Sequence, residues 1–322
     1  MQQFKGKLYL LLAFTLAGTS VVASSILSER LPLFTITAVG LGILLLCMAP
    51  FYGRATIQTI RHLRRQDWMM LILQAWFGML VFRICLLLGV SRTSTLEAGI
   101  LSGTTPMITA VLAFFLLKER LSIKNALGIG CTVVGIMLLQ NTGNTTFMPS
   151  MQHIWGNLFI IGAAASESLF NIISRKQRAA DSRSTALNIH PMVQVYIVSA
   201  IALGFCLIPF LLEQPEPVPM LLLIHWHEWI GLIWYGLIIT GLAFFFFYKG
   251  VAHCSAYTTA AFSGMMPLTS ILLSLLILKE QANYIQGVGG LLIIISIVLI
   301  AEDKRKADIS PVSERKSISK TS

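Results

Sequence analysis

The chain has 322 residues, of which 55% are hydrophobic and only 12% are charged, and its mean hydropathy is +0.75. This composition excludes a soluble globular protein of that size, because such proteins typically carry about 25% charged residues. The formal net charge of +10 leaves two explanations, a nucleic-acid partner or the basic cytoplasmic face of a membrane protein. The placement of the basic residues along the chain decides between them.

Apolar stretches long enough to cross a membrane recur from end to end. A spanning helix needs about 20 predominantly apolar residues. Apolar runs and the polar breaks between them predict ten such helices, which makes this an all-α integral membrane protein. The expected helices are residues 8–27, 33–50, 68–90, 95–117, 123–141, 154–174, 189–212, 229–248, 256–278 and 284–301.

The basic residues alternate between the two sides of this arrangement. With the N-terminus inside, the inner connectors and helix ends collect most of the Lys and Arg, and the outer side receives only Arg30, Arg92 and Lys279. The positive-inside rule predicts this asymmetry for an even number of spans with both termini cytoplasmic. We therefore expect a protein of a bacterial-type plasma membrane, in contact with the lipid bilayer and without a nucleic-acid partner.

The sequence matches itself at an offset of about 161 residues without a gap. Ser102-Gly103 aligns with Ser263-Gly264, Pro106 with Pro267, and Lys118-Glu119 with Lys279-Glu280. An ordered Ser-Gly-x-x-Pro followed at one fixed spacing by Lys-Glu is hard to obtain by chance between apolar helices, so the pattern predicts an internal duplication.

Each predicted half contains five helices, an odd number, so the second half must enter the membrane inverted relative to the first. We expect a first repeat at residues 1–141, an outer connector at 142–153, a second repeat at 154–301 and a polar cytoplasmic tail at 302–322. Inverted repeats are a recurring design of secondary transporters, because two similar halves open a central site alternately to either side.

The repeated tract resembles a known family. Residues Gly89 to Glu119, with Pro106 and the closing Lys118-Glu119-Arg120-Leu121, resemble the EamA repeat of the drug/metabolite transporter superfamily. The resemblance covers both halves and implies a ten-helix exporter-type carrier, with a central cavity lined mainly by the first, third, fourth, sixth, eighth and ninth helices. It implies no particular substrate, since the family handles amino acids, nucleotide-related metabolites, vitamins and drugs.

Pro106 and Pro267 fall near the middle of their predicted helices. Each lacks an N–H and leaves the carbonyl four residues earlier, at Ser102 or Ser263, without its helical partner. Such a break is tolerated where a cavity, a water or a neighbouring side chain satisfies the carbonyl. We interpret both positions as cavity walls and hinges, with a purely structural kink as the alternative; Gly103 and Gly264 would allow close helix approach under either interpretation.

Three ionisable residues lie within predicted spans: Arg83, Glu97 and Glu167. An ionisable group is costly there and usually faces a cavity or a partner. Arg83 shares a helical face with Trp76, seven residues earlier, which predicts a cationic fork beside an aromatic wall for a carboxylate-bearing or planar substrate.

The two acids belong to polar stripes. Glu97 shares its face with Thr104 and Thr105, and Glu167 lines up with Asn171 and Ser174. The alternatives are an ion pair with Arg83 that locks two helices together and, for Glu97, a place at the membrane edge. We hypothesise that Glu167 couples transport to protons by binding one in alternate states. Tyr248, which closes the tract Phe244 to Phe247, is a further candidate cavity residue.

The sequence therefore predicts a secondary transporter that moves a small metabolite, amino-acid-like or another organic solute, by alternating access, for export rather than uptake. A multidrug efflux carrier of the same fold is one alternative. An intramembrane enzyme is another, but it would need a nucleophile-base pair or metal ligands converging within the spans, and the sequence offers neither. We expect no cofactor, no metal and no catalytic residue.

Overall fold

The computed structural model describes residues 2–117, 123–139, 151–181, 189–213, 224–279 and 284–301, and every regular element in these ranges is helical. The first part of the chain forms α1 (Gln2–Ser28), α2 (Leu33–Ile60), α3 (Arg65–Ala75), η1 (Trp76–Val81), α4 (Phe82–Val90), α5 (Thr95–Ser102), α6 (Thr105–Leu112), η2 (Ala113–Leu117) and α7 (Ile123–Leu139). The second part forms α8 (Met151–Asp181), α9 (Pro191–Glu213), α11 (Trp226–Ile233), η3 (Trp234–Leu242), α12 (Ala243–Val251), α13 (Ala256–Ser263), α14 (Met265–Ile277) and α15 (Tyr284–Ala301). The segments η1, η2 and η3 are π-helical stretches that follow α-helices directly.

Seven helical stretches are long and apolar enough to cross a membrane, by their length and composition. They are Gln3–Ser28, Leu33–Ile60, Arg65–Val90, Ile154–Gln177, Pro191–Glu213, Trp226–Val251 and Ala256–Ile277. Two further apolar helical stretches, Thr105–Leu116 and Ala126–Gly135, are shorter. The protein is therefore a multi-pass membrane protein.

Several helices extend beyond the apolar runs that predicted them. Helix α2 was expected to end at residue 50 and continues to Ile60 with Pro50 inside it, and α8 continues past residue 174 to Asp181. A helix can continue beyond its apolar segment, because intrahelical hydrogen bonds satisfy the backbone groups in lipid and in water alike. Apolar composition therefore locates a span but not the helix ends.

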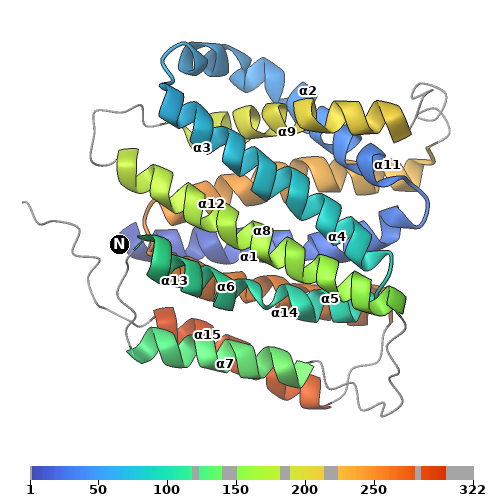
Figure 1. Cartoon of the computed structure of the whole chain (residues 1–322), viewed down its shortest axis with the longest axis vertical. Coiled ribbons are helices and arrows are strands. Elements are labelled where there is room, and N and C mark those ends of the chain that lie inside the picture. The colour runs from blue at the N-terminus through green and yellow to red at the C-terminus, as the bar shows by residue number, and fades with distance from the viewer. Residues whose placement is uncertain are drawn as a thin grey trace, which may run out of the picture.

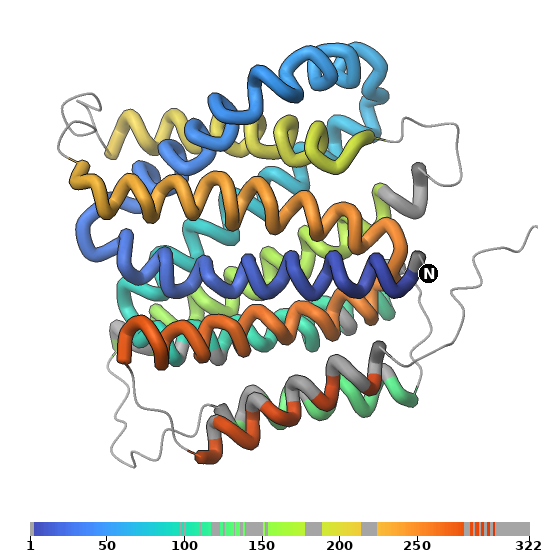
Figure 2. The backbone as a smooth tube through the Cα atoms, turned by 180° about the vertical axis from the view of Figure 1, so that it is seen from behind, coloured from blue at the N-terminus to red at the C-terminus, as the bar shows by residue number. Residues whose placement is uncertain are grey.

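The helices lie side by side along a common direction, with α1 inside the bundle (Figure 1). Helix α1 contacts α4, α12 and α14, while α2 packs against α9 near one edge of the molecule. At the opposite edge α7 and α15 pack against each other, as the view from behind also shows (Figure 2). Helices far apart in sequence thus form the centre of the bundle together.

Glycines permit the close packing around this centre. A Cβ at Gly18 of α1 would lie 2.5 Å from the carbonyl oxygen of Met266 in α14. A Cβ at Gly78 of η1 would lie 2.4 Å from the ring of Phe170 in α8. Any side chain larger than hydrogen would push these elements apart, so both glycines set the position of the helices around the bundle centre.

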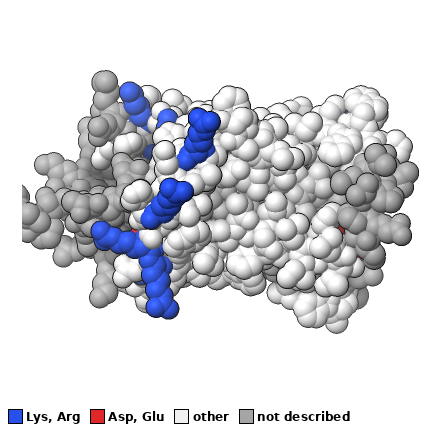
Figure 3. All heavy atoms as spheres, turned by 90° about the horizontal axis from the view of Figure 1, so that it is seen from above, with Lys and Arg blue, Asp and Glu red and all other residues white. Residues whose placement is uncertain are grey.

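The basic side chains gather near one end of the bundle, on the face that Figure 3 shows. The start of α1 and the ends of α8 and α12 lie at one end of the bundle (Figure 1). Arg175 donates from Nη1 to the carbonyl oxygen of Val251 at 3.2 Å, and Nζ of Lys249 lies 5.4 Å from the ring centroid of Tyr9. We call this the basic end of the molecule.

Candidate functional site

A cavity lies between helices from both parts of the chain, and about 480 Å³ of space in and around it, part of which is open to the surroundings, is free of protein atoms. Most of its wall is apolar, and phenylalanine rings make up much of it. The lining residues are Ala13, Phe14, Ala17, Ser20, Gly78, Phe82, Glu167, Phe170, Asn171, Ile239, Ala243, Phe244, Phe247 and Met266. A concave, mostly apolar site with a few polar groups is typical of small-molecule binding.

Three polar side chains face this apolar space: Ser20 of α1 and Glu167 and Asn171 of α8. Glu167 is only 9% exposed, and its Oε2 accepts a hydrogen bond from Thr105 Oγ1 at 3.2 Å. Both amide atoms of Asn171 and the hydroxyl of Ser20 are buried and have no partner among the described residues. Buried polar atoms are normally paired, so these atoms are available to a ligand or to water.

Thr105 connects Glu167 to a break in the neighbouring helix. Helix α5 ends at Ser102 and α6 begins at Thr105, just before Pro106. Besides its contact with Glu167, the Thr105 hydroxyl donates to the carbonyl oxygen of Ser102 at 2.7 Å. This is the carbonyl that Pro106 leaves without a helical donor, so one hydroxyl lies between the free backbone group and the buried acid.

The second helix break has the same position but different side chains. Helix α13 ends at Ser263 and α14 begins at Met265, with Gly264 in the turn and Pro267 in the first turn of the new helix. At an offset of about 161 residues, Thr105 corresponds to Met266, which is buried and lines the cavity. This break therefore offers no hydroxyl at that position.

Arg83 and Trp76 do not form the pair expected from their spacing. Arg83 is 3% exposed, whereas Trp76 is 42% exposed and packs edge-on against Phe205 with ring centroids 5.4 Å apart. Trp76 begins the π-helical segment η1, and Arg83 follows that segment in α4. A π turn holds about one residue more than an α turn, so it rotates the following residues by roughly 100° and separates positions that an unbroken α-helix would align.

Arg83 instead contacts η3. Its guanidinium carbon lies 4.7 Å from the ring centroid of Tyr235, and its Nη2 donates to Thr240, whose hydroxyl donates in turn to the carbonyl of Tyr235 at 2.8 Å. Ser24 of α1 donates to the Tyr235 hydroxyl at 3.3 Å. Nη1 of Arg83 has no partner among the described residues. We call Ser24, Arg83, Tyr235 and Thr240 the arginine cluster.

A second polar cluster lies on the other side of the cavity, toward the basic end. Gln194 Nε2 donates to Gln74 Oε1 at 2.9 Å and to Gln177 Oε1 at 3.0 Å, and Gln74 Nε2 also donates to Gln177. The Tyr248 hydroxyl donates to Gln74 Oε1 at 2.9 Å. All four side chains are buried. We call Gln74, Gln177, Gln194 and Tyr248 the glutamine cluster.

Sequence reasoning missed the three glutamines and expected Tyr248 to reach the cavity. The structure directs the Tyr248 hydroxyl to Gln74 and packs its ring against Phe170, with centroids 6.0 Å apart. One signal was available, because Gln74 and Gln194 each interrupt an otherwise apolar stretch of a predicted span. Their convergence depends on helix packing.

Some predicted residues fall outside what the structure describes. The backbone of Glu97 belongs to α5, but its side chain is not among the described ones. Lys118, Glu119 and Glu280 also lie outside the described residues, as do the tail at 302–322 and most of the connector. Gly103 lies between α5 and α6. Among the described residues, no group of three or more His, Cys, Asp or Glu is placed to hold a metal ion.

Comparison with known proteins identifies the family. The profile of the EamA-like transporter family matches residues 4–140 and again residues 154–301. The chain belongs to the EamA-like transporter family. This membership confirms the resemblance carried by the repeated tract, and it makes the protein a membrane transporter of the plasma membrane.

Relatives of this EamA-like transporter include bacterial proteins of similar length. The chain is 30% identical to the uncharacterized transporter YetK of Bacillus subtilis over 318 residues, which cover 95% of this chain and 89% of YetK. It is 24% identical to the uncharacterized inner membrane transporter YicL of Salmonella typhimurium, over 94% of this chain and 97% of YicL. A solved structure titled "Crystal structure of protein" shares the fold, with a TM-score of 0.63 at 19% identity over 91% of this chain and 95% of that one.

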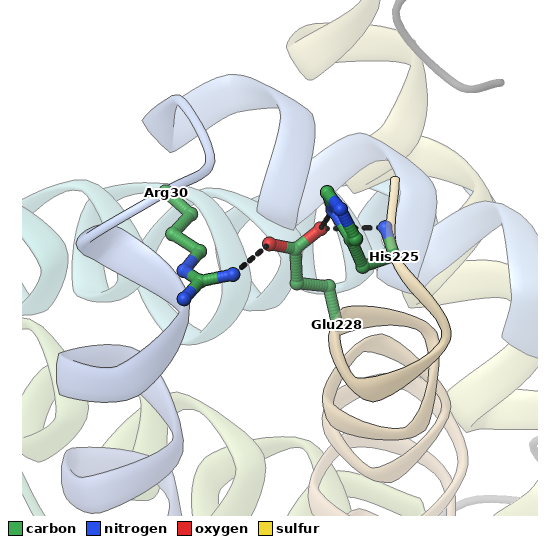
Figure 4. A network of polar contacts seen from close by, with 3 residues as sticks. All are labelled: Arg30, His225 and Glu228. Atoms are coloured by element: carbon green, nitrogen blue, oxygen red, sulfur yellow. Dashed lines mark hydrogen bonds and ion pairs between the residues drawn. The ribbon is translucent and has the colours of Figure 1, made fainter. Parts of the chain in front are cut away.

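The EamA-like transporter carries a third polar network at the end away from the basic one. Figure 4 shows Glu228, in the first turn of α11, pointing toward Arg30 and His225. Its Oε1 lies 3.6 Å from Arg30 Nη1, and its Oε2 accepts a hydrogen bond from the His225 backbone at 2.8 Å. Arg30 is largely exposed, so the ion pair contributes little stability and mainly links the end of α1 to α11.

Proposed function

We propose that this EamA-like transporter is a secondary carrier that moves a small organic solute through the Glu167 cavity by alternating access, in the direction of export. The observation that carries the proposal is the cavity, which holds a buried acid and an amide without a partner in the described part of the chain, and which lies between two polar clusters. Alternating access requires a central solute-binding site that can open to either side in turn. Polar contacts that close the site on each side, and that can separate, would meet this requirement.

The proposed architecture is ten spanning helices in two inverted five-helix repeats, with both termini at the cytoplasmic basic end. The family profile matches the chain in two successive segments, which supports a duplication. Two structural features recur at the repeat offset of about 161 residues: the helix break after Ser102 and after Ser263, and the π-helical segments η1 and η3. The positive-inside rule supports a cytoplasmic basic end.

The two polar clusters are proposed gates. Along α3 to α4, Gln74 precedes the lining residues Gly78 and Phe82, and Arg83 follows them. The glutamine cluster therefore closes the cavity toward the basic end, and the arginine cluster closes it toward the other end. Each cluster joins helices from both proposed repeats, so each must separate when the halves move.

Glu167 is the proposed proton-coupling group, and Thr105 is its link to the helix break. The Thr105 hydroxyl has one proton to donate. When Glu167 is ionised the carboxylate attracts that proton, and when Glu167 is protonated it donates to Thr105 Oγ1, which leaves the Thr105 proton for the Ser102 carbonyl. Protonation would thereby change the hydrogen bonding at the break before Pro106.

Counterflow tests the carrier. The full chain is reconstituted in proteoliposomes loaded with a pooled metabolite extract, and solutes that exchange are identified by mass spectrometry. Ala17 lines the cavity, so Ala17→Phe fills it and should abolish exchange; Ala200→Phe, on the exposed surface of α9, should leave exchange intact. A single exchanged compound class supports a metabolite carrier, many unrelated classes support the multidrug alternative, and exchange that survives Ala17→Phe contradicts transport through this cavity.

A further inference from the structure

The charge of the residues that line the cavity indicates the chemical class of the ligand. Glu167 is the one ionisable residue among the lining residues, so every formal charge on the described wall is negative or absent. Arg83 follows the lining residue Phe82, but its guanidinium is directed to Tyr235 and Thr240. A carboxylate or phosphate in the cavity would meet Glu167 without a cation among the lining residues to offset the repulsion, whereas an ammonium group would be attracted.

The aromatic rings favour the same class. Phe170 is a central wall residue, and its ring centroid lies 5.2 Å from that of Phe244 and 4.9 Å from that of Phe247. Phe14 packs edge-on against Phe247 with centroids 5.9 Å apart. The faces of such rings carry partial negative charge and attract desolvated cations, and they also pack against flat or apolar groups. The wall therefore suits an organic cation with an aromatic or alkyl body.

The unpartnered polar atoms suit a further group on the ligand. Asn171 is 2% exposed and Ser20 is 1% exposed, both line the cavity, and neither side chain has a hydrogen-bond partner among the described residues. One carboxyl oxygen of Glu167, Oε2, accepts from Thr105, while its Oε1 makes no hydrogen bond to a described residue. A donor-rich group such as an alkylammonium has up to three N–H bonds to give to the acceptors of this set, which are Asn171 Oδ1, Ser20 Oγ and Glu167 Oε1, while Asn171 Nδ2 is left to donate to water or to an acceptor on the ligand.

We propose that the ligand of this cavity is a small organic amine in its protonated form, with an aromatic or branched apolar body. The ammonium group pairs with Glu167 and donates to Asn171 and Ser20, and the body packs among the phenylalanines. This inference rests on the proposed carrier function, which it deepens by naming a substrate class.

Equilibrium binding to the purified full chain in lipid nanodiscs tests the class without requiring transport. Four probes share one indole body and differ in the charge of the side chain: tryptamine is cationic, tryptophan zwitterionic, tryptophol neutral and indole-3-propionate anionic. We expect tryptamine to bind at least about tenfold more tightly than the other three, because a hydrogen bond to a charged partner is the strongest contact that distinguishes them.

Substitutions of acidic residues test whether the preference for tryptamine arises in the cavity. Glu167→Gln should lose most tryptamine affinity, and Glu167→Asp should retain part of it. Glu213→Gln is the matched control, because this half-buried acid lies outside the cavity lining. Its Oε2 accepts from the backbone N–H of Phe34 at 2.9 Å. Tryptamine affinity should not change in that variant.

The outcomes separate this inference from the carrier function. Tighter binding of tryptophan or indole-3-propionate, absence of tryptamine binding, or tryptamine binding that Glu167→Gln leaves unchanged would each overturn the amine proposal. Counterflow of anionic solutes alone would also overturn it while sustaining the carrier. Tryptamine binding as expected, together with no counterflow of any solute, would sustain the amine site and contradict the carrier.

Discussion

Glu167 is the residue on which the proposed mechanism depends most directly. It combines burial, a position in the cavity wall and a hydrogen bond to the hydroxyl beside a helix break. A buried ionisable side chain in a span is costly to maintain, and in transporters such residues mark ion and substrate pathways. The Glu167→Gln substitution keeps the size and polarity of the side chain and removes its ability to exchange a proton.

We expect Glu167→Gln to abolish solute accumulation driven by an imposed pH gradient, because the variant binds no proton in either state. Accumulation is measured in proteoliposomes with an acidic or a neutral exterior. Wild-type protein should show a strong dependence on the gradient and the variant none. Gradient-driven accumulation by a correctly inserted Glu167→Gln protein would exclude proton coupling through this residue.

Thr105 is expected to transmit the state of Glu167 to the helix break. Thr105→Val keeps the shape and removes the hydroxyl, which leaves the Ser102 carbonyl and Glu167 Oε2 without this donor. We predict a loss of about 1–3 kcal/mol in the free energy of unfolding, the usual cost of an unsatisfied buried group, and a changed pH profile of the exchange rate. Thr105→Ser should restore the wild-type profile; a stability loss without a change in the profile would make Thr105 structural only.

For the individual residues, the sequence predicted that Glu167 belongs to the site but did not predict most of the side chains around it. The spacing within α8 was sufficient to predict that Glu167 and Asn171 share a face, because that helix is unbroken. The same reasoning failed for Trp76 and Arg83, since the chain from Trp76 to Val81 is π-helical and no residue type predicts a π-helical turn. The Thr105 contact joins residues 62 positions apart, and it follows only from how α6 packs against α8.

Two helices that contain proline are interrupted, at α5–α6 and at α13–α14, whereas other helices with proline are continuous. Pro50 and Pro209 lie inside α2 and α9, which continue through them, whereas the breaks before Pro106 and Pro267 each include a Ser-Gly pair. Proline alone therefore does not explain the interruption. A glycine three residues before the proline lowers the cost of leaving helical geometry, and the repeated motif predicted both break positions from the sequence.

We predict that Pro106→Ala and Pro267→Ala slow transport severalfold without destabilising the protein. Alanine restores the missing N–H and favours a continuous helix, which should stiffen the proposed hinges. Initial exchange rates and thermal unfolding would be measured together. Pro209→Ala in α9 is the matched control and should leave the rate unchanged; if all three variants behave alike, the breaks are structural kinks.

For the whole molecule, composition predicted the class. Seven of the ten expected spans correspond to helical stretches that are long and apolar enough to cross a membrane, and the resemblance to EamA-like transporters is confirmed by the family comparison. The count of ten spans and the orientation read from loop charge stay predictions. The proposed gates could not be predicted from sequence patterns. Gln74, Gln177 and Gln194 come from three different helices, and only the packed bundle brings their side chains into hydrogen-bond distance.

Alternating access requires the two gates to open in turn, and this requirement can be measured. The natural cysteines Cys47, Cys85, Cys131, Cys206 and Cys254 are replaced, and Ser20→Cys places one thiol in the cavity wall. A membrane-impermeant thiol reagent is then applied to either face of oriented vesicles. Gln74→Leu disrupts the glutamine cluster, and Gln58→Leu on the exposed surface of α2 is the matched control.

The account predicts that Gln74→Leu makes the Ser20→Cys thiol react faster from the cytoplasmic face and slower from the outer face, because weakening one gate shifts the population toward the state open on that side. Loss of a buried hydrogen-bonded side chain is worth about 1–3 kcal/mol, so the two rates should change severalfold or more in opposite directions. Faster reaction from both faces, or no change from either, would contradict a carrier whose cavity opens alternately through these clusters.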